Sequence, residues 1–417
     1  MLRLITRHGQ VAKDAQYING HLFPAGDVGL SDLGREQARL LGERLKKEGF
    51  KGKILASPFL RTMETANIVA GLTGNKVIPF AGLHEMFFTE ESLSTYVGKT
   101  QEQLCEIFEH VDKQSSLEFP WWINKIETIE EMEKRVLLAK EKAEEMFPNQ
   151  PILFVGHGAS VHGLTIAYGI KKTIPDFIYN CALSYVDTNN QDFKKVHCDV
   201  SHIPYEMTTS NSLTREEFDL DYFDKPYDKQ INLPDGINQI NGKKILHIGD
   251  THSIAYPYYK KLIEITKPDI ILHTGDMADE VKVGRMPETR YEYLTKIKWF
   301  TNMLNQSGAK LIVVLGNNDI EEEIRKMLPT AEVYNTNTLI ALDNEVCRIG
   351  HQVLSMTFDK EWAFYGHGPT GETWSFEKNT RDGEKRFNAY LDKYLVCISE
   401  KKFFKIVIED EIIKAFL

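Results

Sequence analysis

Short apolar runs that end in polar motifs recur along this chain, and this pattern constrains its fold more than any other feature. In the first half, three such runs have the character of buried strands: Leu2–Thr6, Lys53–Ala56 and Ile152–Val155. Ser31–Lys47 carries a leucine stripe at helical spacing and begins with a serine that suits an N-cap. This alternation of strands and helices predicts a largely parallel sheet with helices on both faces.

The second half of the chain starts the same pattern again. Its apolar runs are Lys244–Ile248, Ile270–His273 and Leu311–Leu315, and each leads into a polar motif. With 417 residues the chain is too long for one ordinary hydrophobic core, so we expect more than one domain.

A stretch of different composition separates the two halves. Residues 206–241 are rich in Asp, Asn, Thr, Tyr and Pro and show weak periodicity, which indicates a linker that lies partly on the surface. We therefore predict one domain over residues 1–205, a linker over 206–241 and a second domain over 242–417.

Composition and charge narrow the classes of function. No run approaches the ~20 apolar residues that span a bilayer, and the first residues lack a secretion signal, so we expect a cytoplasmic protein without a membrane partner. The five cysteines form no C-x-x-C pair, which favours reduced thiols over disulfides or a zinc site. A net charge of −10 makes nucleic acid an unfavourable partner, whereas a small phosphorylated metabolite or nucleotide needs only a local positive site.

Arginine and histidine side chains follow all three strands of the first half. Arg7 and His8 come directly after the first strand, Arg61 follows the second, and His157 follows the third. Because the carboxyl ends of parallel strands meet at one edge of a sheet, these side chains are expected to surround one spot. Arginine forks and helix N-termini bind phosphate oxygens, so the pattern predicts a phosphate site.

These residues resemble the histidine phosphatase superfamily, also called phosphoglycerate mutase-like. The resemblance covers residues 1–200 approximately and implies a three-layer α/β/α domain. Five motifs carry it, in order and at matching spacing: R-H-G at Arg7–Gly9, L-S-D-L-G-R-E-Q-A at Leu30–Ala38, S-P-F-L-R-T at Ser57–Thr62, L-H-E at Leu83–Glu85 and G-H-G at Gly156–Gly158.

The resemblance implies a mechanism without a metal. His8 attacks phosphorus and becomes a phosphohistidine, while Arg7, Arg61 and His157 bind the phosphoryl oxygens. Glu85 protonates the leaving oxygen and then activates water.

Phosphatase activity is favoured over mutase activity. The mutases of this superfamily carry R-H-G-E and a long insertion, whereas Gln10 follows Gly9 here and the segment after Glu85 is moderate in length. Four aromatic residues of that segment either form a lid over a partly apolar substrate or pack in the core: Phe87, Phe88, Trp121 and Trp122.

Metal-binding residue types follow the strands of the second half. Asp250 and His252 stand on one turn, Asp276 follows the next strand, Asn317 follows the third, and His367 comes later. This mixture of oxygen and nitrogen ligands suits Mn²⁺, Fe or Zn²⁺ in a hydrolase with two metal ions.

This half looks like the calcineurin-like metallophosphoesterase superfamily, on the motifs D-x-H, G-D and G-N-x-D. The resemblance covers residues 242–417 approximately and implies a four-layer α/β/β/α sandwich. It also implies that Asp250 and His252 bind one ion, that Asp276 bridges two, and that Asn317 and His367 bind the second.

Two positions depart from this family. Asn318 replaces a histidine that assists phosphate or the leaving group, and we predict it as a substrate-binding residue. Pro369 replaces a metal-binding histidine, which removes one ligand and leaves one or two ions as alternatives. His351 is a candidate for a remaining ligand, although Gln352 rather than glycine follows it.

Two hypotheses follow. The first is a bifunctional phosphohydrolase, in which a metal-dependent phosphodiesterase opens a diester and the histidine phosphatase removes the resulting monoester. The second, motivated by Asn318 and Pro369, is an active histidine phosphatase fused to a catalytically degenerate domain that binds or regulates. A nuclease is disfavoured because the chain has no basic cluster with interleaved aromatic residues.

Overall fold

The chain divides into two compact units, Met1–Arg215 and Glu216–Leu417, which are taken separately below. The computed structural model describes residues 1–18, 20–24, 26–170, 178–190, 195–335, 337–352, 356, 359–368, 385–390 and 392–407. In the expected linker, β9 (Thr209–Ser210) and β10 (Leu213–Thr214) form a hairpin, and α7 (Arg215–Asp224) follows it.

A mixed six-stranded sheet forms the centre of the first unit. Its first four strands are parallel, β7 runs antiparallel to them, and β8 pairs antiparallel with β7. The order across the sheet is β5 (Val77–Pro79), β4 (Lys53–Ala56), β6 (Ile152–Gly156), β1 (Leu2–Arg7), β7 (Leu183–Asp187) and β8 (Val196–Asp199).

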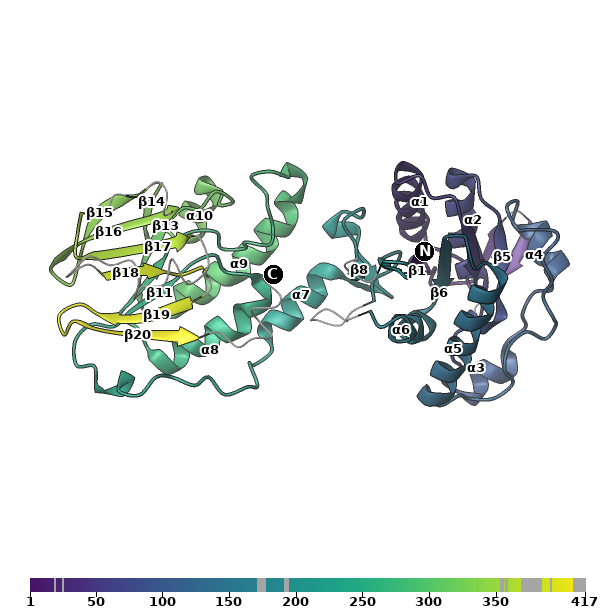
Figure 1. Cartoon of the computed structure of the whole chain (residues 1–417), viewed down its shortest axis with the longest axis horizontal. Coiled ribbons are helices and arrows are strands. Elements are labelled where there is room, and N and C mark those ends of the chain that lie inside the picture. The colour runs from purple at the N-terminus through teal and green to yellow at the C-terminus, as the bar shows by residue number, and fades with distance from the viewer. Residues whose placement is uncertain are drawn as a thin grey trace. The chain divides into compact units, whose positions relative to one another are not determined.

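Helices cover both faces of this sheet and bury a separate core on each, as the expected three-layer fold requires (Figure 1). On one face lie α1 (Asp32–Lys47) and α2 (Leu60–Thr73), and on the other lie α5 (Ile129–Met146) and α6 (Gly158–Ala167). Smaller elements complete the unit: β2 (Gln16–Ile18), β3 (His21–Phe23), α3 (Glu90–Thr95) and α4 (Gln101–Ile107).

The second unit also has a mixed six-stranded sheet. Its order is β14 (Glu332–Tyr334), β13 (Lys310–Val314), β12 (Ile270–His273), β11 (Ile245–Ile248), β19 (Asp392–Cys397) and β20 (Lys402–Val407). The first four strands are parallel, so the ends of β11, β12 and β13 lie along one edge.

A four-stranded sheet packs face to face on this one through an apolar core that includes Ile312, Trp362 and Phe364. Its strands are β15 (Thr338–Leu342), β16 (Glu345–Gln352), β17 (Trp362–His367) and β18 (Lys385–Asn388). The opposite face of the six-stranded sheet carries α8 (Tyr256–Thr266), α9 (Arg290–Gln306) and α10 (Glu321–Met327).

These elements form three of the four expected layers. The three are one layer of helices and two sheets. Within the described ranges no helix follows α10. The six strands expected from the sequence agree with β1, β4, β6, β11, β12 and β13 to within one residue at each end. None of the described helices is both long and apolar enough to cross a membrane.

Removal of a buried side chain from α1 should destabilise the first unit. Leu41 is fully buried against the sheet, so Leu41→Ala is expected to cost about 2–5 kcal/mol of unfolding free energy. Leu138→Ala in α5 is the matched control, because that side chain is 57% exposed. Scanning calorimetry would show a lower transition for Leu41→Ala alone, and equal shifts for both variants would contradict the assignment of the core.

Candidate active sites

The first site lies where β1, β4 and β6 end. Arg7 pairs with Gly156 in the β1–β6 ladder, so His8 and His157 follow their strands at the same level, and their ring centroids lie 5.3 Å apart. Gly34 of α1 approaches so closely that a Cβ on it would lie 2.0 Å from the Gln10 carbonyl oxygen. Glycine at position 34 therefore lets α1 pack against the loop that carries His8.

His8 is held in the form that a nucleophile needs. The side chain is 4% exposed, and Nδ1 lies 2.7 Å from the Gly9 carbonyl oxygen. Because a carbonyl can only accept, Nδ1 carries the hydrogen and Nε2 keeps its lone pair. Burial, together with the charges of Arg61 and Arg7, holds the pKa of His8 well below its usual range, so the ring is neutral.

Two arginines supply positive charge at this site. Arg7 is buried, and its Nε has no hydrogen-bond partner in the described structure. Arg61 stands in the first turn of α2, with its guanidinium 4.5 Å from the centre of the Phe59 ring. A buried donor without an acceptor is costly, and a phosphoryl oxygen would satisfy it.

The second histidine lies between a hydroxyl and a carboxyl group. His157 Nε2 is 2.8 Å from Ser57 Oγ. Its Nδ1 has no hydrogen-bond partner among the described residues and is 4.0 Å from Glu85 Oε2. Burial lowers the pKa of His157 well below its usual range, and Arg61 adds to this shift. Burial raises the pKa of Glu85, although Arg61 and Arg7 oppose the shift.

The geometry therefore brings all five expected residues of the first site into one region: Arg7, His8, Arg61, Glu85 and His157. Glu85 is a carboxyl group whose raised pKa suits proton donation to a leaving oxygen. A neutral histidine is able to act as a nucleophile, and two arginines are able to donate to an oxyanion, so this arrangement suits transfer of a phosphoryl group.

Sequence reasoning missed Asp27 at this site. Its carboxylate accepts hydrogen bonds from Leu60 N at 3.0 Å and Tyr96 OH at 3.2 Å, and it lies 3.8 Å from Arg61 Nη1. Burial raises the pKa of Asp27 to about 6, and Arg61 opposes that shift. A lone aspartate outside any motif gives no signal in the sequence that it lies beside Arg61.

The aromatic segment after Glu85 is mostly core. Phe87 and Trp121 are buried in a cluster with Phe59, and Phe88 is 71% exposed. Phe59 also packs edge-on against the His157 ring, at 5.0 Å between centroids. This cluster supports the wall of the phosphate site.

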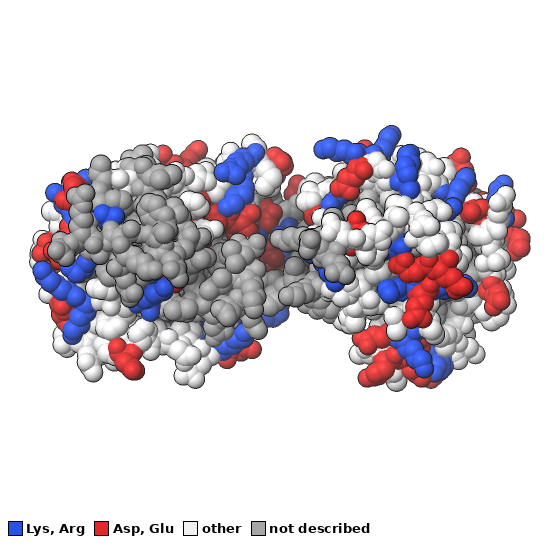
Figure 2. Space-filling model, in the orientation of Figure 1, with Lys and Arg blue, Asp and Glu red and all other residues white. Residues whose placement is uncertain are grey.

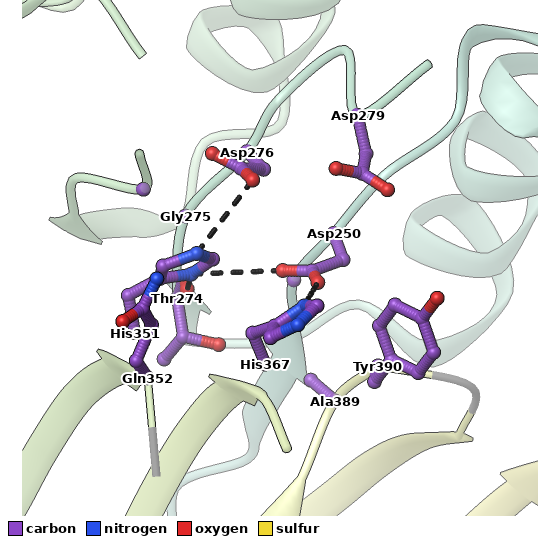
Figure 3. Close-up of polar contacts among 12 residues, drawn as sticks. Asp250, Thr274, Gly275, Asp276, Asp279, His351, Gln352, His367, Ala389 and Tyr390 are labelled. Atoms are coloured by element: carbon purple, nitrogen blue, oxygen red, sulfur yellow. Dashed lines mark hydrogen bonds and ion pairs between the residues drawn. The ribbon is translucent and has the colours of Figure 1, made fainter. Parts of the chain in front are cut away.

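The second site lies at the ends of β11 and β12, beside β16. Asp250, Asp276 and His351 are buried, and one ligand atom of each lies within 4.8 Å of the others (Figure 3). Asp250 and Asp276 have positive φ angles of 44° and 56°, which turn the chain sharply after each strand. His351 lies near the end of β16, in the four-stranded sheet that packs on the six-stranded sheet, and this packing brings it to the two aspartates.

Acceptor atoms face one another around His351. Its Nδ1 lies 2.8 Å from the Thr274 carbonyl oxygen, so in the neutral ring Nδ1 carries the hydrogen and Nε2 a lone pair. That Nε2 lies 3.2 Å from Asn317 Oδ1 and 3.6 Å from Asp276 Oδ2. Such an arrangement of acceptors is stabilised by a cation between them.

A nearby positive charge would stabilise the carboxyl groups of this site, as it would the acceptor atoms around His351. Burial raises the pKa of Asp276 to about 8, and Asp319 and Asp250 add to the shift. Burial also raises the pKa of Asp250, whose Oδ1 accepts no hydrogen bond in the described structure. The donor set of two carboxylates and an imidazole fits a divalent transition metal.

Asn318 and Asp319 hold the loop that carries Asp276. Asn318 donates to both oxygens of Asp276, from its backbone N at 2.8 Å and from Nδ2 at 2.9 Å. Asp319 accepts from the backbone N atoms of Asp276 and Met277 at 2.8 and 3.0 Å. Asp319 was missed as a site residue, although the G-N-x-D motif contains it.

Besides Asn317, two expected histidine ligands lie outside the group of three. His252 has its Nδ1 3.6 Å from Glu280 Oε2, and burial lowers its pKa. His367 donates from Nδ1 to Asp250 Oδ2 at 2.8 Å, and this bond raises the pKa of the ring. The predicted departure at Pro369 lies outside the described residues.

Comparison with known proteins assigns both halves of the chain. Residues 4–200 match the histidine phosphatase superfamily (branch 1), and residues 243–404 match the calcineurin-like phosphoesterases. The chain carries one domain of each family. The histidine phosphatase domain contains the site around His8, and the phosphoesterase domain contains the group around His351.

Individual relatives match the histidine phosphatase domain. Phosphoglycerate mutase-like protein 4 of Arabidopsis thaliana is 26% identical over 167 residues, which are 39% of this chain and 68% of that protein. The uncharacterized phosphatase PhoE of Bacillus subtilis is 28% identical over 163 residues, 39% of this chain and 76% of that protein. The structure of ecdysone phosphate phosphatase from Bombix mori is 21% identical, with a TM-score of 0.35 over 48% of this chain and 94% of that chain.

Loss of the histidine in the group of three should weaken metal binding. His351→Ala removes the only nitrogen of the group, so we expect the apparent Mn²⁺ affinity to fall on the order of a hundredfold. His162→Ala, a half-buried histidine of the other domain, is the control. Plasma mass spectrometry would measure the metal content of each variant after reconstitution and dialysis. Equal metal content in both variants would exclude His351 as a ligand.

Proposed function

We propose that the chain is a bifunctional phosphohydrolase with a metal-independent monoesterase in its first domain and a metal-dependent diesterase or phosphatase in its second. The observation that carries the proposal is the meeting of a neutral His8, two arginines and a carboxyl group of raised pKa at one sheet edge. Family membership of both domains in phosphoesterase superfamilies supports it.

In the monoesterase reaction, His8 Nε2 attacks phosphorus while Arg7 and Arg61 bind the phosphoryl oxygens. The bond to the leaving oxygen breaks, and that oxygen takes a proton from Glu85. Water then attacks the phosphohistidine, gives its proton to Glu85 and releases inorganic phosphate. His157 binds a phosphoryl oxygen from the wall beside Ser57.

In the second domain, Asp250, Asp276 and His351 would hold the metal. A bound divalent ion supplies positive charge for the phosphate oxygens and lowers the pKa of coordinated water. Asn318 keeps both oxygens of Asp276 in place, and Asn317 presents its carbonyl oxygen beside His351. Mn²⁺, Fe and Zn²⁺ all suit these ligands.

A small phosphorylated metabolite or nucleotide is the proposed substrate class. On the described part of the face in Figure 2, lysine and arginine are interspersed with aspartate and glutamate, which gives no broad track for a polyanion. The two activities together suggest that a diester is opened first and that its monoester product loses phosphate next.

The second candidate function is a phosphoesterase domain that binds a ligand without catalysis. The contact of His252 with Glu280 favours this candidate. It places the imidazole outside the group of three, so the site has three buried ligands without His252. Metal content and diesterase activity distinguish the two candidates.

Removal of His8 should separate the two activities. With a chromogenic monoester in EDTA, His8→Ala is expected to lose activity by a factor on the order of 10³ or more, because the substitution removes the proposed nucleophile. Hydrolysis of a chromogenic diester with Mn²⁺ should be unchanged, and His162→Ala should retain both activities. Monoesterase that persists in His8→Ala, or a diesterase that is absent from the wild type, would reject the corresponding half of the proposal.

The pH profile of the monoesterase should reflect two displaced pKa values. Because the pKa of His8 is lowered, activity should persist well below pH 6.5 and be lost only as His8 gains a proton. Because the pKa of Glu85 is raised, activity should be lost as pH rises through a value above that of an ordinary glutamate. Glu85→Gln should abolish this upper limb and slow an alkyl phosphate about 10²-fold or more, whereas Glu133→Gln, on the surface, should change neither.

A further inference from the structure

A hairpin that lies beyond the matched part of the first domain reaches its phosphate site. The hairpin consists of β9 and β10, with Ser210 paired to Leu213 and Thr209 to Thr214. It follows residue 200, where the histidine phosphatase match ends, and leads directly into α7. The hairpin belongs to the same compact unit as His8.

The hairpin holds one edge of the Arg7 guanidinium. Arg7 Nη1 donates to Ser210 Oγ at 3.0 Å and to the Ile178 carbonyl oxygen at 2.9 Å, and Nη2 donates to Asn211 Oδ1. Nη1 therefore uses both of its hydrogens. The hydrogen of Nε and one hydrogen of Nη2 remain for a ligand. Nε has no acceptor in the described structure, and a phosphate oxygen would accept from it.

The acceptors on the hairpin are neutral. Ser210 offers a hydroxyl and Asn211 an amide carbonyl, and among the described residues no carboxylate forms an ion pair with Arg7. A carboxylate in their place would orient the arginine equally well but would offset its charge. Neutral acceptors orient Arg7 and leave its full charge for an anion.

A second set of contacts joins the hairpin to the nucleophile. Thr209 Oγ1 lies 3.0 Å from Asn180 Oδ1, and Asn180 Nδ2 donates to the His8 carbonyl oxygen at 2.9 Å. Gln37 of α1 donates to Thr209 Oγ1 at 2.9 Å and accepts from Gln10 N at 2.9 Å. Thr209, Asn180 and Gln37 are fully buried, so these bonds are shielded from water.

We propose that Ser210 and Asn211 of the hairpin belong to the monoesterase site and position Arg7 for the phosphoryl group. This inference rests on the proposed monoesterase function and adds two positioning residues to it. The site is then complete only when the segment that leads into α7 is folded against it.

The test compares anion affinity in variants of the full chain. Ser210→Ala combined with Asn211→Gly removes both side-chain acceptors; glycine is chosen because Asn211 has φ 57°, where alanine would be strained. Binding of inorganic phosphate in EDTA, by titration calorimetry, is expected to weaken about tenfold, and KM for the monoester should rise more than kcat falls.

Two further variants separate positioning from a folding defect. Ser210→Thr keeps the hydroxyl and should bind phosphate within about threefold of the wild type. Leu213→Ala changes a side chain of the same hairpin that is 47% exposed, and it should bind as the wild type does. Equal loss of affinity in the double variant and in Leu213→Ala would assign the hairpin a structural role only and would overturn the proposal.

The same measurements distinguish a failure of this inference from a failure of the proposed monoesterase function on which it rests. A wild type that binds phosphate but hydrolyses no monoester would reject the monoesterase, while the comparison of affinities would still decide the role of the hairpin. An active wild type whose double variant binds phosphate unchanged would reject the hairpin and leave the monoesterase intact. A wild type that does not bind phosphate in EDTA would overturn both.

Discussion

Parallel pairing of the central strands is the constraint on which both sites depend. In the first domain, β1 and β6 end in register, so the residues that follow them leave the sheet at the same level. In the second, β11, β12 and β13 do the same, and the polar loops after them meet at one edge. Hydrogen-bonded ladders thus fix the spacing of candidate site residues that lie more than a hundred positions apart in the first domain.

The two sites have opposite electrostatic demands. Around His8, the buried Arg7 and the partly buried Arg61 lie near a neutral imidazole, and an anion would supply an acceptor for the unpartnered Nε of Arg7. Around His351, lone pairs and carboxyl groups face one another. Negative charge is unfavourable there, and the pKa of Asp276 is raised for that reason. An oxyanion would stabilise the first site and a cation the second, as the proposed metal-independent and metal-dependent esterases require.

Several site residues could be found in the sequence because they belong to motifs at strand ends. Arg7, His8, Arg61 and His157 are of this kind, and the structure brings them together. Asp27 could not be found, because its role depends on the position of α2 and of Tyr96. His252 illustrates the opposite case: the motif suggests a ligand, and its contact with Glu280 depends on the loop after β12.

The sequence by itself determined the two-domain organisation, the strands that carry the motifs and the chemistry of each half, because hydrophobic periodicity and motif order are local properties of the chain. Tertiary structure alone decided that His351 joins Asp250 and Asp276, since the sheet that contains β16 has to pack on the six-stranded sheet before the three can meet. It also decided that Ser210 and Asn211 reach Arg7, from a segment whose composition indicates only a linker. Contacts between distant segments arise from packing, and no local pattern encodes them.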